Sequence, residues 1–266
     1  MITVHTLASG SSGNASLIRC GDTAGLLDAG ISCRRITTSL RELGLTVDDL
    51  TAVLITHTHT DHIAGLQTMM KKSTCPIFAS EAAARDLWDR TPACAGHLES
   101  FTPGAAFALG AFTVRPFAIS HDAPGSCGYR LDTEDGSVGL LTDSGYVTEE
   151  ATETLSGCDL MLLEANHDVE TLECGPYPYY LKQRILGNHG HLSNETAARF
   201  AVTLADSGTR ELILSHLSRE NNTPAMAYNT VERALSAAGL SPRLTGAPRD
   251  CLSQAYTVCG RSICRK

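Results

Sequence analysis

The chain has 266 residues, and its 42% hydrophobic and 19% charged content is that of an ordinary globular protein. No segment approaches the ~20 consecutive apolar residues of a membrane-spanning helix, and the N-terminal segment lacks the features of a secretion signal. We therefore expect a cytoplasmic protein that does not bind membranes. The net charge of −8, from 21 basic and 29 acidic residues, weakens a nucleic-acid-binding reading without excluding it, because bound cations neutralise carboxylates locally.

The ten cysteines include no Cys-x-x-Cys pair, which argues against a zinc finger or a thioredoxin-like redox site. Cys20, Cys127, Cys158 and Cys259 lie in or beside apolar stretches, where cysteine usually packs as a small buried hydrophobe. We expect all ten to be reduced and to serve packing.

Hydrophobic periodicity predicts an alternation of strands and helices. In chain order, we expect strands over 3–8, 15–20 and 25–30, a helix over 32–43, a strand over 51–56, a helix over 61–71, a strand over 76–79, a helix over 80–89, strands over 112–120, 126–132 and 137–142, a helix over 147–155, a strand over 159–164, a helix over 193–204, a strand over 211–215 and a helix over 223–238. Ser80 and Ser193 are predicted N-caps, and Pro224 a first helical residue. The pattern indicates an α/β fold with two facing sheets and outer helices, built as a single domain over residues 1–266.

The most informative motif is His57-Thr58-His59-Thr60-Asp61-His62, directly after an apolar, β-branched strand. His57 and His59 can turn toward one ion, while Asp61 and His62 can reach a second ion beside it. Imidazole and carboxylate donors suit zinc, and also manganese or iron, better than calcium or magnesium. The alternative, a solvated histidine-rich turn, is disfavoured because four potential ligands fall within six residues.

Three more polar residues come immediately after apolar strands. His121 follows Phe117 to Ser120, Asp143 follows Gly139 to Thr142, and His216 follows Leu212 to Ser215. Each of them alone would be read as an ordinary loop residue. Their repetition predicts further ligands at other strand ends.

In order and context, these residues resemble the metal-ligand series of the metallo-β-lactamase superfamily. The resemblance implies a four-layer αββα sandwich that holds two divalent transition-metal ions, zinc being the first expectation and manganese or iron the alternatives. It implies that His57, His59 and His121 hold one ion, that Asp61, His62 and His216 hold the other, and that Asp143 bridges both. An aspartate at position 143, where the superfamily's β-lactamases mostly carry cysteine, is typical of its phosphodiesterases and thioesterases.

Within the superfamily the chain is most similar to the WalJ (YycJ) group of bacterial proteins, described as DNA exonucleases. The segments that carry this resemblance are Leu7 to Asn14, Leu163 to Asp168, Gly190 to Asn194 and His216 to Ser218. Only 73 residues separate Asp143 from His216, so the long insertions of β-CASP nucleases are absent. How a long nucleic acid would be clamped is left open.

We assign catalytic roles to Asp61, Glu164 and His191. Two ions can activate a water for attack on a phosphodiester, and the departing alkoxide then needs a proton. His191, between Gly190 and a helix capped by Ser193, is the predicted acid, and Glu164 at a strand end is expected to orient it. The alternative for His191 is a histidine at the helix entry that makes only a backbone hydrogen bond.

The remaining polar positions are weaker candidates. We assign substrate binding to Ser11, Ser12, Asn14 and Asn194, although a plain hairpin turn explains the glycine-rich loop equally well. Asp28 is expected to hydrogen-bond loop backbone or a ligand histidine. The roles of His167, His189 and Arg219 are left open.

The predicted function is hydrolysis of a phosphodiester substrate, DNA before RNA or a small phosphodiester, as a nuclease acting on DNA ends. The alternative is a thioesterase or a hydrolase of small cyclic esters or lactones at the same dinuclear site. A third possibility, a non-enzymatic module braced by metal, ranks last because structural zinc sites are usually closed and rich in sulfur. The sequence gives neither the physiological metal, nor the cleavage polarity, nor the oligomeric state.

Overall fold

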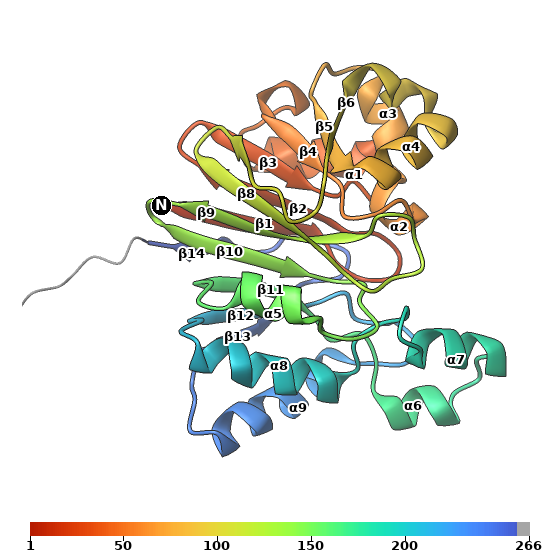
Figure 1. The fold of residues 1–266 in the computed structure, drawn as a ribbon, viewed down its shortest axis with the longest axis vertical. Helices are drawn as coiled ribbons and strands as arrows, with labels where there is room; N and C mark the ends of the chain where they lie inside the picture. The colour runs from red at the N-terminus through yellow and green to blue at the C-terminus, as the bar shows by residue number, and fades with distance from the viewer. Residues whose placement is uncertain (260–266) are drawn as a thin grey trace, which may run out of the picture.

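The computed structural model describes residues 1–259, and within this range the strands form two seven-stranded sheets that face each other (Figure 1). The first sheet contains, in spatial order, β14 (Tyr256–Val258), β1 (Ile2–Ala8), β2 (Ala15–Cys20), β3 (Thr23–Leu27), β4 (Ala52–Leu54), β5 (Ile77–Ser80) and β6 (Leu98–Phe101). The second contains β13 (Arg243–Gly246), β12 (Glu211–Ser215), β11 (Leu160–Glu164), β10 (Gly136–Leu141), β9 (Cys127–Thr133), β8 (Phe112–Ala118) and β7 (Phe107–Leu109).

Each sheet is antiparallel on one side and parallel on the other. In the first sheet β14, β1, β2 and β3 pair antiparallel, whereas β3, β4, β5 and β6 run parallel. In the second, β7 to β10 pair antiparallel and β10 to β13 run parallel. Parallel strands finish at the same edge of a sheet, so the residues that follow β4, β10, β11 and β12 can meet at one end of the molecule.

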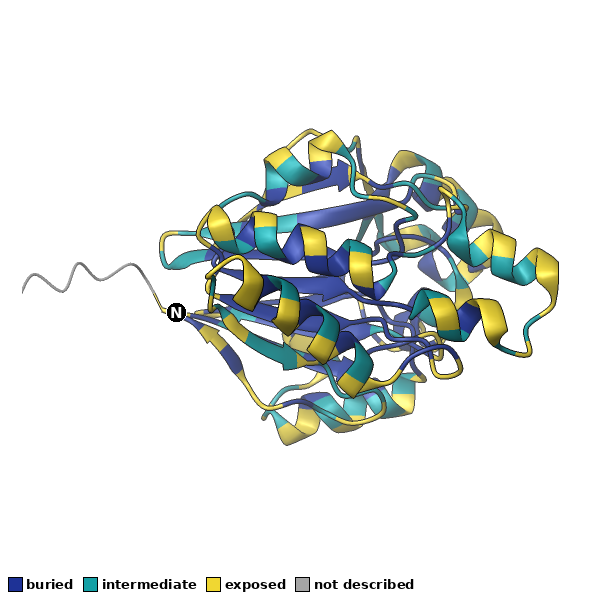
Figure 2. Ribbon diagram, turned by 90° about the horizontal axis from the view of Figure 1, so that it is seen from below, coloured by how far each residue is buried: buried dark blue, intermediate teal, exposed yellow. Residues whose placement is uncertain are grey.

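Helices cover the outer face of each sheet. The helices of the described residues are α1 (Cys33–Glu42), α2 (Thr60–Ile63), α3 (Leu66–Met70), α4 (Glu81–Arg90), α5 (Glu149–Leu155), α6 (Val169–Cys174), α7 (Tyr179–Leu186), α8 (Asn194–Asp206) and α9 (Pro224–Ala237), with short 3₁₀ turns at Val47–Asp49 and Pro92–His97. Helices α1, α3 and α4 pack on the first sheet, and α5, α8 and α9 on the second. The central strands, such as β3, β4, β11 and β12, are buried throughout, whereas the edge strands β6 and β13 are partly exposed, and the covering helices keep one face in solvent (Figure 2).

Three apolar layers hold these four layers of structure together. One lies between the first sheet and its helices, one between the two sheets, and one between the second sheet and its helices. Strand β11 illustrates the alternation: Leu160 and Leu162 point into the layer between the sheets, whereas Met161 and Leu163 point toward the helices. The predicted αββα architecture is confirmed. That residues 1–266 form a single domain stays a prediction.

The helix starts follow the predicted capping chemistry. The Ser80 hydroxyl accepts from the amide of Ala83 at the start of α4, and the Ser193 hydroxyl accepts from Thr196 at the start of α8. Pro224 occupies the first turn of α9, as predicted. The short elements β6, β7, β13, β14, α6 and α7 were not predicted.

One predicted helix is wrong in its length. Residues 61–71 form two short helices, α2 and α3, because the backbone leaves the helical hydrogen-bond pattern between them. The Gly65 amide donates to the carbonyl of Ala29 at 2.8 Å, outside the helix. A Cβ at Gly65 would lie 2.2 Å from the backbone oxygen of Ile31, so only glycine allows this close approach.

The cysteines of residues 1–259 are all free thiols, and Cys264 lies outside this range. The packing role is wrong for Cys174, Cys251 and Cys259, which are exposed. Among the described residues, no helix combines the length and the apolar character that crossing a membrane requires.

Candidate metal centre

The predicted ligands come together where strands of both sheets end. The run from His57 to His62 follows β4 of the first sheet, whereas Asp143 and His216 follow β10 and β12 of the second. His121 lies in the connection between β8 and β9. The centre therefore sits between the two sheets, at the edge where their parallel strands finish.

Three non-glycine residues at these strand ends have a left-handed backbone. Asp28 follows β3, Asp143 follows β10 and His216 follows β12, with φ values of 59°, 60° and 55°. Among the described non-glycine residues, only these three have positive φ. A side chain in this region costs about 1–3 kcal/mol, and such residues concentrate at functional sites. Each bends the chain sharply and turns its side chain toward the shared edge.

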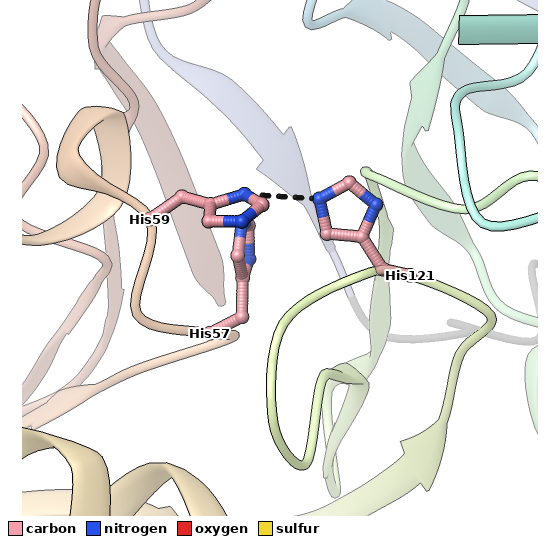
Figure 3. A group of neighbouring side chains, drawn as sticks. All are labelled: His57, His59 and His121. Atoms are coloured by element: carbon pink, nitrogen blue, oxygen red, sulfur yellow. Dashed lines mark hydrogen bonds between the residues drawn. The ribbon is translucent and has the colours of Figure 1, made fainter. Parts of the chain in front are cut away.

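His57, His59 and His121 form the first donor group (Figure 3). Nδ1 of His59 lies 3.2 Å from Nε2 of His121, and the ring of His57 lies 4.7 and 4.8 Å from theirs between centroids. Two nitrogens held ~2.1 Å from a tetrahedral zinc ion lie ~3.4 Å apart, so the separation of His59 and His121 suits a common ion.

Asp61, His62 and His216 form the second donor group. Oδ2 of Asp61 lies 3.5 Å from Nε2 of both His62 and His216. The imidazoles are completely buried, whereas the Asp61 side chain is a quarter exposed. This group can hold a second ion, with Asp61 at its accessible side.

Asp143 lies between the two groups. Its Oδ1 is 3.9 Å from Nε2 of His121 and 3.5 Å from Nε2 of His216, and its Oδ2 is 3.3 Å from Nε2 of His62. The Asp143 carboxylate therefore contacts both groups, which is the arrangement that a bridging ligand needs.

The histidines each present one free nitrogen to the centre, because the other ring nitrogen faces an acceptor. The outer nitrogens of His57, His59, His62, His121 and His216 face, respectively, Thr56 Oγ1 (3.0 Å), Asp122 Oδ1 (3.3 Å), Asp28 Oδ2 (2.7 Å), His189 O (3.1 Å) and Glu164 Oε1 (2.9 Å). A carbonyl or carboxylate can only accept, so the outer nitrogens of His59, His62, His121 and His216 carry a proton, and the other ring nitrogen is the one that can bind an ion.

Several inward-facing atoms lack a protein partner. Within residues 1–259, Nε2 of His57, Nε2 of His216 and Oδ2 of Asp143 are buried and accept or donate no hydrogen bond. Buried polar atoms in folded proteins are nearly always paired. Orphaned nitrogen and oxygen donors that converge in this way fit divalent metal ions.

Electrostatics keep the first group ready for a cation. Burial lowers the pKa of His59 and His121 and, most strongly, that of His57, so these rings are neutral near pH 7. Burial by itself would raise the pKa of Asp143, but the neighbouring His216 and His62 hold it well below its usual range. The bridging position is therefore an ionised carboxylate at neutral pH.

The second group binds protons more tightly. Burial disfavours the charged form of His216, yet the Asp143 carboxylate and the nearby carboxylates of Asp61 and Glu164 outweigh it and raise the pKa of His216 to about 10. His62 is affected in the same direction: the nearby Asp143 and Asp28 outweigh its burial and raise its pKa well above the usual value. A cation that binds here must displace protons.

Glu164 and His191 lie beside the second group, as predicted. Nδ1 of His191 is 2.9 Å from Oε1 of Glu164 and 3.5 Å from Oδ1 of Asp143, and one fifth of the His191 side chain is exposed. Oε2 of Glu164 accepts from the amides of Ser144 and Leu192. Burial would raise the pKa of Glu164, but His191 and the hydrogen bonds from both histidines lower it to about 2.

The predicted substrate-binding residues separate into three kinds. Asn14 is at the centre, with Nδ2 3.0 Å from Nε2 of His62 and 3.4 Å from Oδ2 of Asp61. Ser11 and Ser12 are exposed on the preceding turn. Asn194 is completely buried, and its amide pairs reciprocally with that of Asn222, so we withdraw it from the substrate-binding set.

The residues whose roles were left open also differ in their surroundings. His167 is buried with its Nδ1 unpaired among the described residues, and burial lowers its pKa to about 4. His189 is exposed, with Nδ1 3.1 Å from Oγ of Ser120. Arg219 makes an exposed ion pair with Asp250. This ion pair involves none of the donor residues.

Sequence reasoning missed two residues next to the first donor group. Oδ1 of Asp122 lies 3.3 Å from Nε2 of His59, and Oδ2 of Asp122 lies 2.6 Å from Nε of Arg184. The adjacent pair His121-Asp122 was a possible signal for Asp122, because ligand histidines commonly donate to a carboxylate. Nothing in the sequence pairs Arg184 with position 122.

The sequence of this chain is similar to a known protein family and to two bacterial enzymes. A sequence family described as "Beta-lactamase superfamily domain" matches residues 25–217. Exodeoxyribonuclease WalJ of Streptococcus pneumoniae serotype 2 (strain D39 / NCTC 7466) is 38% identical over 239 residues, which cover 88% of each protein. Exodeoxyribonuclease YycJ of Bacillus anthracis is 32% identical over 238 residues, 88% of this chain and 89% of that protein.

Among solved structures, the metallo-beta-lactamase fold protein YhfI from Bacillus subtilis aligns with a TM-score of 0.70. The alignment covers 96% of this chain and 100% of that one, at 18% sequence identity. Likeness at this level of identity concerns the fold.

Proposed function

Because this chain belongs to the beta-lactamase superfamily, we propose that it is a metal-dependent phosphodiesterase that degrades DNA from an end. The similarity to two exodeoxyribonucleases over most of the chain supports this substrate class. The observation that carries the proposal is the contact of His191 with Glu164 beside two donor groups that share Asp143. That contact gives the centre a proton donor for the departing oxygen of a phosphodiester.

In this proposal the donor groups hold two divalent cations. His57, His59 and His121 hold one, Asp61, His62 and His216 hold the other, and Asp143 contacts both, with zinc as the first expectation and manganese or iron as alternatives. Cations at these positions supply Lewis acidity and lower the pKa of water to near neutrality. Asn14, with its amide beside Asp61 and His62, orients the reacting phosphate from the same side.

His191 is the proposed acid for the leaving group. The ionised Glu164 carboxylate accepts the Nδ1 proton of His191, which leaves Nε2 as the atom that gives a proton to the departing alkoxide. The partial exposure of His191 allows a substrate to reach it, whereas Glu164 is fully buried and acts through the histidine rings that it orients. Glu164 is therefore a positioning residue.

The alternative of thioester or lactone hydrolysis uses the same donor groups but has less need of an acid at position 191. A turnover screen separates the two. Protein loaded with zinc or manganese is incubated with bis-p-nitrophenyl phosphate, end-labelled single- and double-stranded DNA, covalently closed circular DNA, RNA and an acyl thioester. We expect turnover of the chromogenic diester and release of nucleotides from linear DNA, with circular DNA intact.

The control for this screen is the double variant His57→Ala/His59→Ala, purified in parallel. It removes the first donor group, so any activity that it retains comes from a contaminating nuclease. Hydrolysis of the thioester without turnover of any phosphodiester would overturn the proposed function. Cleavage of circular DNA would replace the exonuclease by an endonuclease.

A further inference from the structure

Helices α6 and α7 stand apart from the stacked layers (Figure 1). They lie at the same side of the molecule as α2, which carries Asp61 and His62. We call residues 169–186 the tyrosine arm. Helix α7 buries none of its residues within the described structure, so it contributes nothing to the apolar interior. Two of its aromatic side chains, Tyr179 and Tyr180, are 77% and 74% exposed. Large aromatic surfaces left in water at adjacent positions indicate a binding surface.

The segment that directly follows the tyrosine arm contacts the residues around the first donor group. The carbonyl of Asn188 accepts from the Ser120 hydroxyl at 2.7 Å, and the carbonyl of His189 faces Nδ1 of His121 at 3.1 Å. The segment that ends the arm therefore orients a proposed metal ligand.

A second connection runs through side chains. Arg184 on α7 pairs with Asp122 at 2.6 Å, and Asp122 faces Nε2 of His59 at 3.3 Å. Arg184 and Tyr180 are four residues apart, so they share one face of α7 about 6 Å apart along the helix axis. An extended ligand that lies along this face would run from Tyr180 past Arg184 toward His59 of the metal centre.

The backbone of the arm presents the rings in a fixed way. The run Gly175-Pro176-Tyr177-Pro178 precedes α7, and each proline fixes its own φ. The Lys182 ammonium donates to the carbonyl of Glu173, which ties α7 to α6. These constraints hold the backbone from which the two rings project.

The chemistry of this surface fits a single-stranded nucleic acid. Helix α7 carries Lys182 and Arg184 and no acidic residue, whereas the glutamates of the arm, Glu170 and Glu173, lie on α6. Arg184 pairs with Asp122, so among the described residues Lys182 is the cation of α7 that is not ion-paired with a carboxylate and can approach a phosphate. Exposed aromatic rings stack on bases of any sequence, and single-strand-binding surfaces combine these two features. A second copy of the chain would use the same rings but gives no reason for the connection to His59 and His121.

We propose that the tyrosine arm binds the DNA strand that enters the metal centre, with Tyr179 and Tyr180 stacking on its bases; the proposal rests on the proposed exonuclease function. Stacked nucleotides rise ~3.4 Å each along a strand. Tyr180 lies about 6 Å along the helix axis from Arg184, so the contacted bases lie a few nucleotides from the phosphodiester that is cleaved. The arm thereby offers one way in which a long nucleic acid is held, a point that the sequence left open.

The test compares Tyr179→Ala/Tyr180→Ala with the matched control Tyr179→Phe/Tyr180→Phe, which keeps the aromatic faces. On single-stranded oligonucleotides the alanine variant should raise KM by roughly 5- to 150-fold with kcat unchanged, and the phenylalanine variant should behave like the parent. Both variants should hydrolyse bis-p-nitrophenyl phosphate at the parental rate, because this small diester does not reach the arm. An alanine variant with parental KM for oligonucleotides would overturn the proposal.

Oligonucleotides with one abasic position locate the contact. Moving the abasic nucleotide from the second to the eighth position from the cleaved end should weaken binding to the parent only at positions a few nucleotides from that end. The abasic nucleotide should not weaken binding to the alanine variant at those positions, because the rings that would stack on that base are already absent. An equal loss of affinity at every abasic position would contradict stacking of the tyrosines on bases at a fixed distance from the cleaved end.

Equilibrium binding separates this proposal from the proposed function. Polarisation of a fluorescent oligothymidine, measured with chelator-treated protein, reports on the arm without turnover. Weaker binding by the alanine variant supports the arm even if the parent cleaves no DNA. Equal binding by all variants, with a lower sedimentation coefficient only for the alanine variant, would assign the rings to contacts between copies of the chain and reject the proposal.

Discussion

His191 and His216 share one hydrogen-bond acceptor: the Nδ1 atoms of both rings lie 2.9 Å from Oε1 of Glu164. The ring of His216 belongs to the second donor group, and the ring of His191 is the proposed proton donor. One buried carboxylate thus fixes the orientation of a metal ligand and of an acid together. Sequence reasoning assigned Glu164 only to His191, so the contact with His216 changes what a Glu164 variant should do.

For Glu164→Gln we expect a loss of activity together with a loss of metal. The Glu164 carboxylate accepts from two rings and from the amides of Ser144 and Leu192, whereas a glutamine has one accepting oxygen and an NH₂ group that cannot accept. With limiting zinc, elemental analysis should find the second ion depleted. A variant that keeps both ions and loses rate only on DNA would show that His216 does not depend on Glu164.

His191→Ala should separate proton donation from metal binding. The variant should keep both ions and lose about 10²- to 10⁴-fold in rate on DNA, because the departing alkoxide no longer receives a proton. The loss should be much smaller on bis-p-nitrophenyl phosphate, since p-nitrophenolate leaves without a proton. Steady-state rates on the two substrates, with metal content measured in parallel, check this prediction. An equal loss on both would make His191 a residue that positions substrate.

Asp143→Ala should lower the occupancy of both donor groups. The Asp143 carboxylate lies within 3.9 Å of ligand nitrogens in each group, and no other described carboxylate does so. Metal content of protein purified without chelator should fall from close to two ions per chain toward zero. Asp143→Asn is the control for the left-handed backbone, because asparagine tolerates positive φ. Retention of two tightly bound ions in the alanine variant contradicts a bridging role.

The two donor groups should differ in how zinc binding depends on pH. The lowered pKa values of His57, His59 and His121 leave these rings neutral at pH 7.5, so the first ion should bind without releasing ring protons. The raised pKa values of His62 and His216 keep these rings protonated at this pH, so the second ion should release about two protons.

The affinity for the second ion should therefore fall by about 100-fold for each pH unit below neutrality, and rise as the pH increases toward the pKa of about 10 at His216. Calorimetric titrations in buffers of different ionisation enthalpy measure the protons released per ion. Two ions with identical buffer dependence would disprove the assignment of His62 and His216 to a proton-binding group.

The donor positions could be predicted because the sequence repeats one local arrangement. Asp143 and His216 come after runs of consecutive apolar residues, and such runs are typical of parallel strands buried on both faces. The ends of parallel strands meet at one edge of a sheet, so local patterns were sufficient to bring distant residues together. The caps at Ser80 and Ser193 were predictable for the same reason, since capping involves residues within one turn.

What could not be predicted depends on contacts between segments far apart in the chain. The break of the helix at Gly65 follows from its bond to Ala29, and neither local propensity nor spacing contains that contact. Asn194 was placed in the substrate site by resemblance, whereas its burial is set by Asn222 on another loop. The tyrosine arm was missed because α7 is short and its apolar residues Leu181, Ile185 and Leu186 are only half-buried, so burial does not mark it as a core helix.

The left-handed backbones of Asp28, Asp143 and His216 affect how the protein acquires its ions. Asp143 and His216 lie at strand ends of the second sheet, and Asp28 accepts from the His62 ring, so we expect folding to precede metal binding. The affinity of nitrogen and oxygen sites for divalent metal ions rises from manganese to copper, and the ion that is bound in a cell also depends on which ions are available. The metal found in a purified sample therefore reflects the culture medium. The same polypeptide grown with excess manganese or excess zinc should carry different ions in an unchanged backbone, which metal analysis of the two preparations can test.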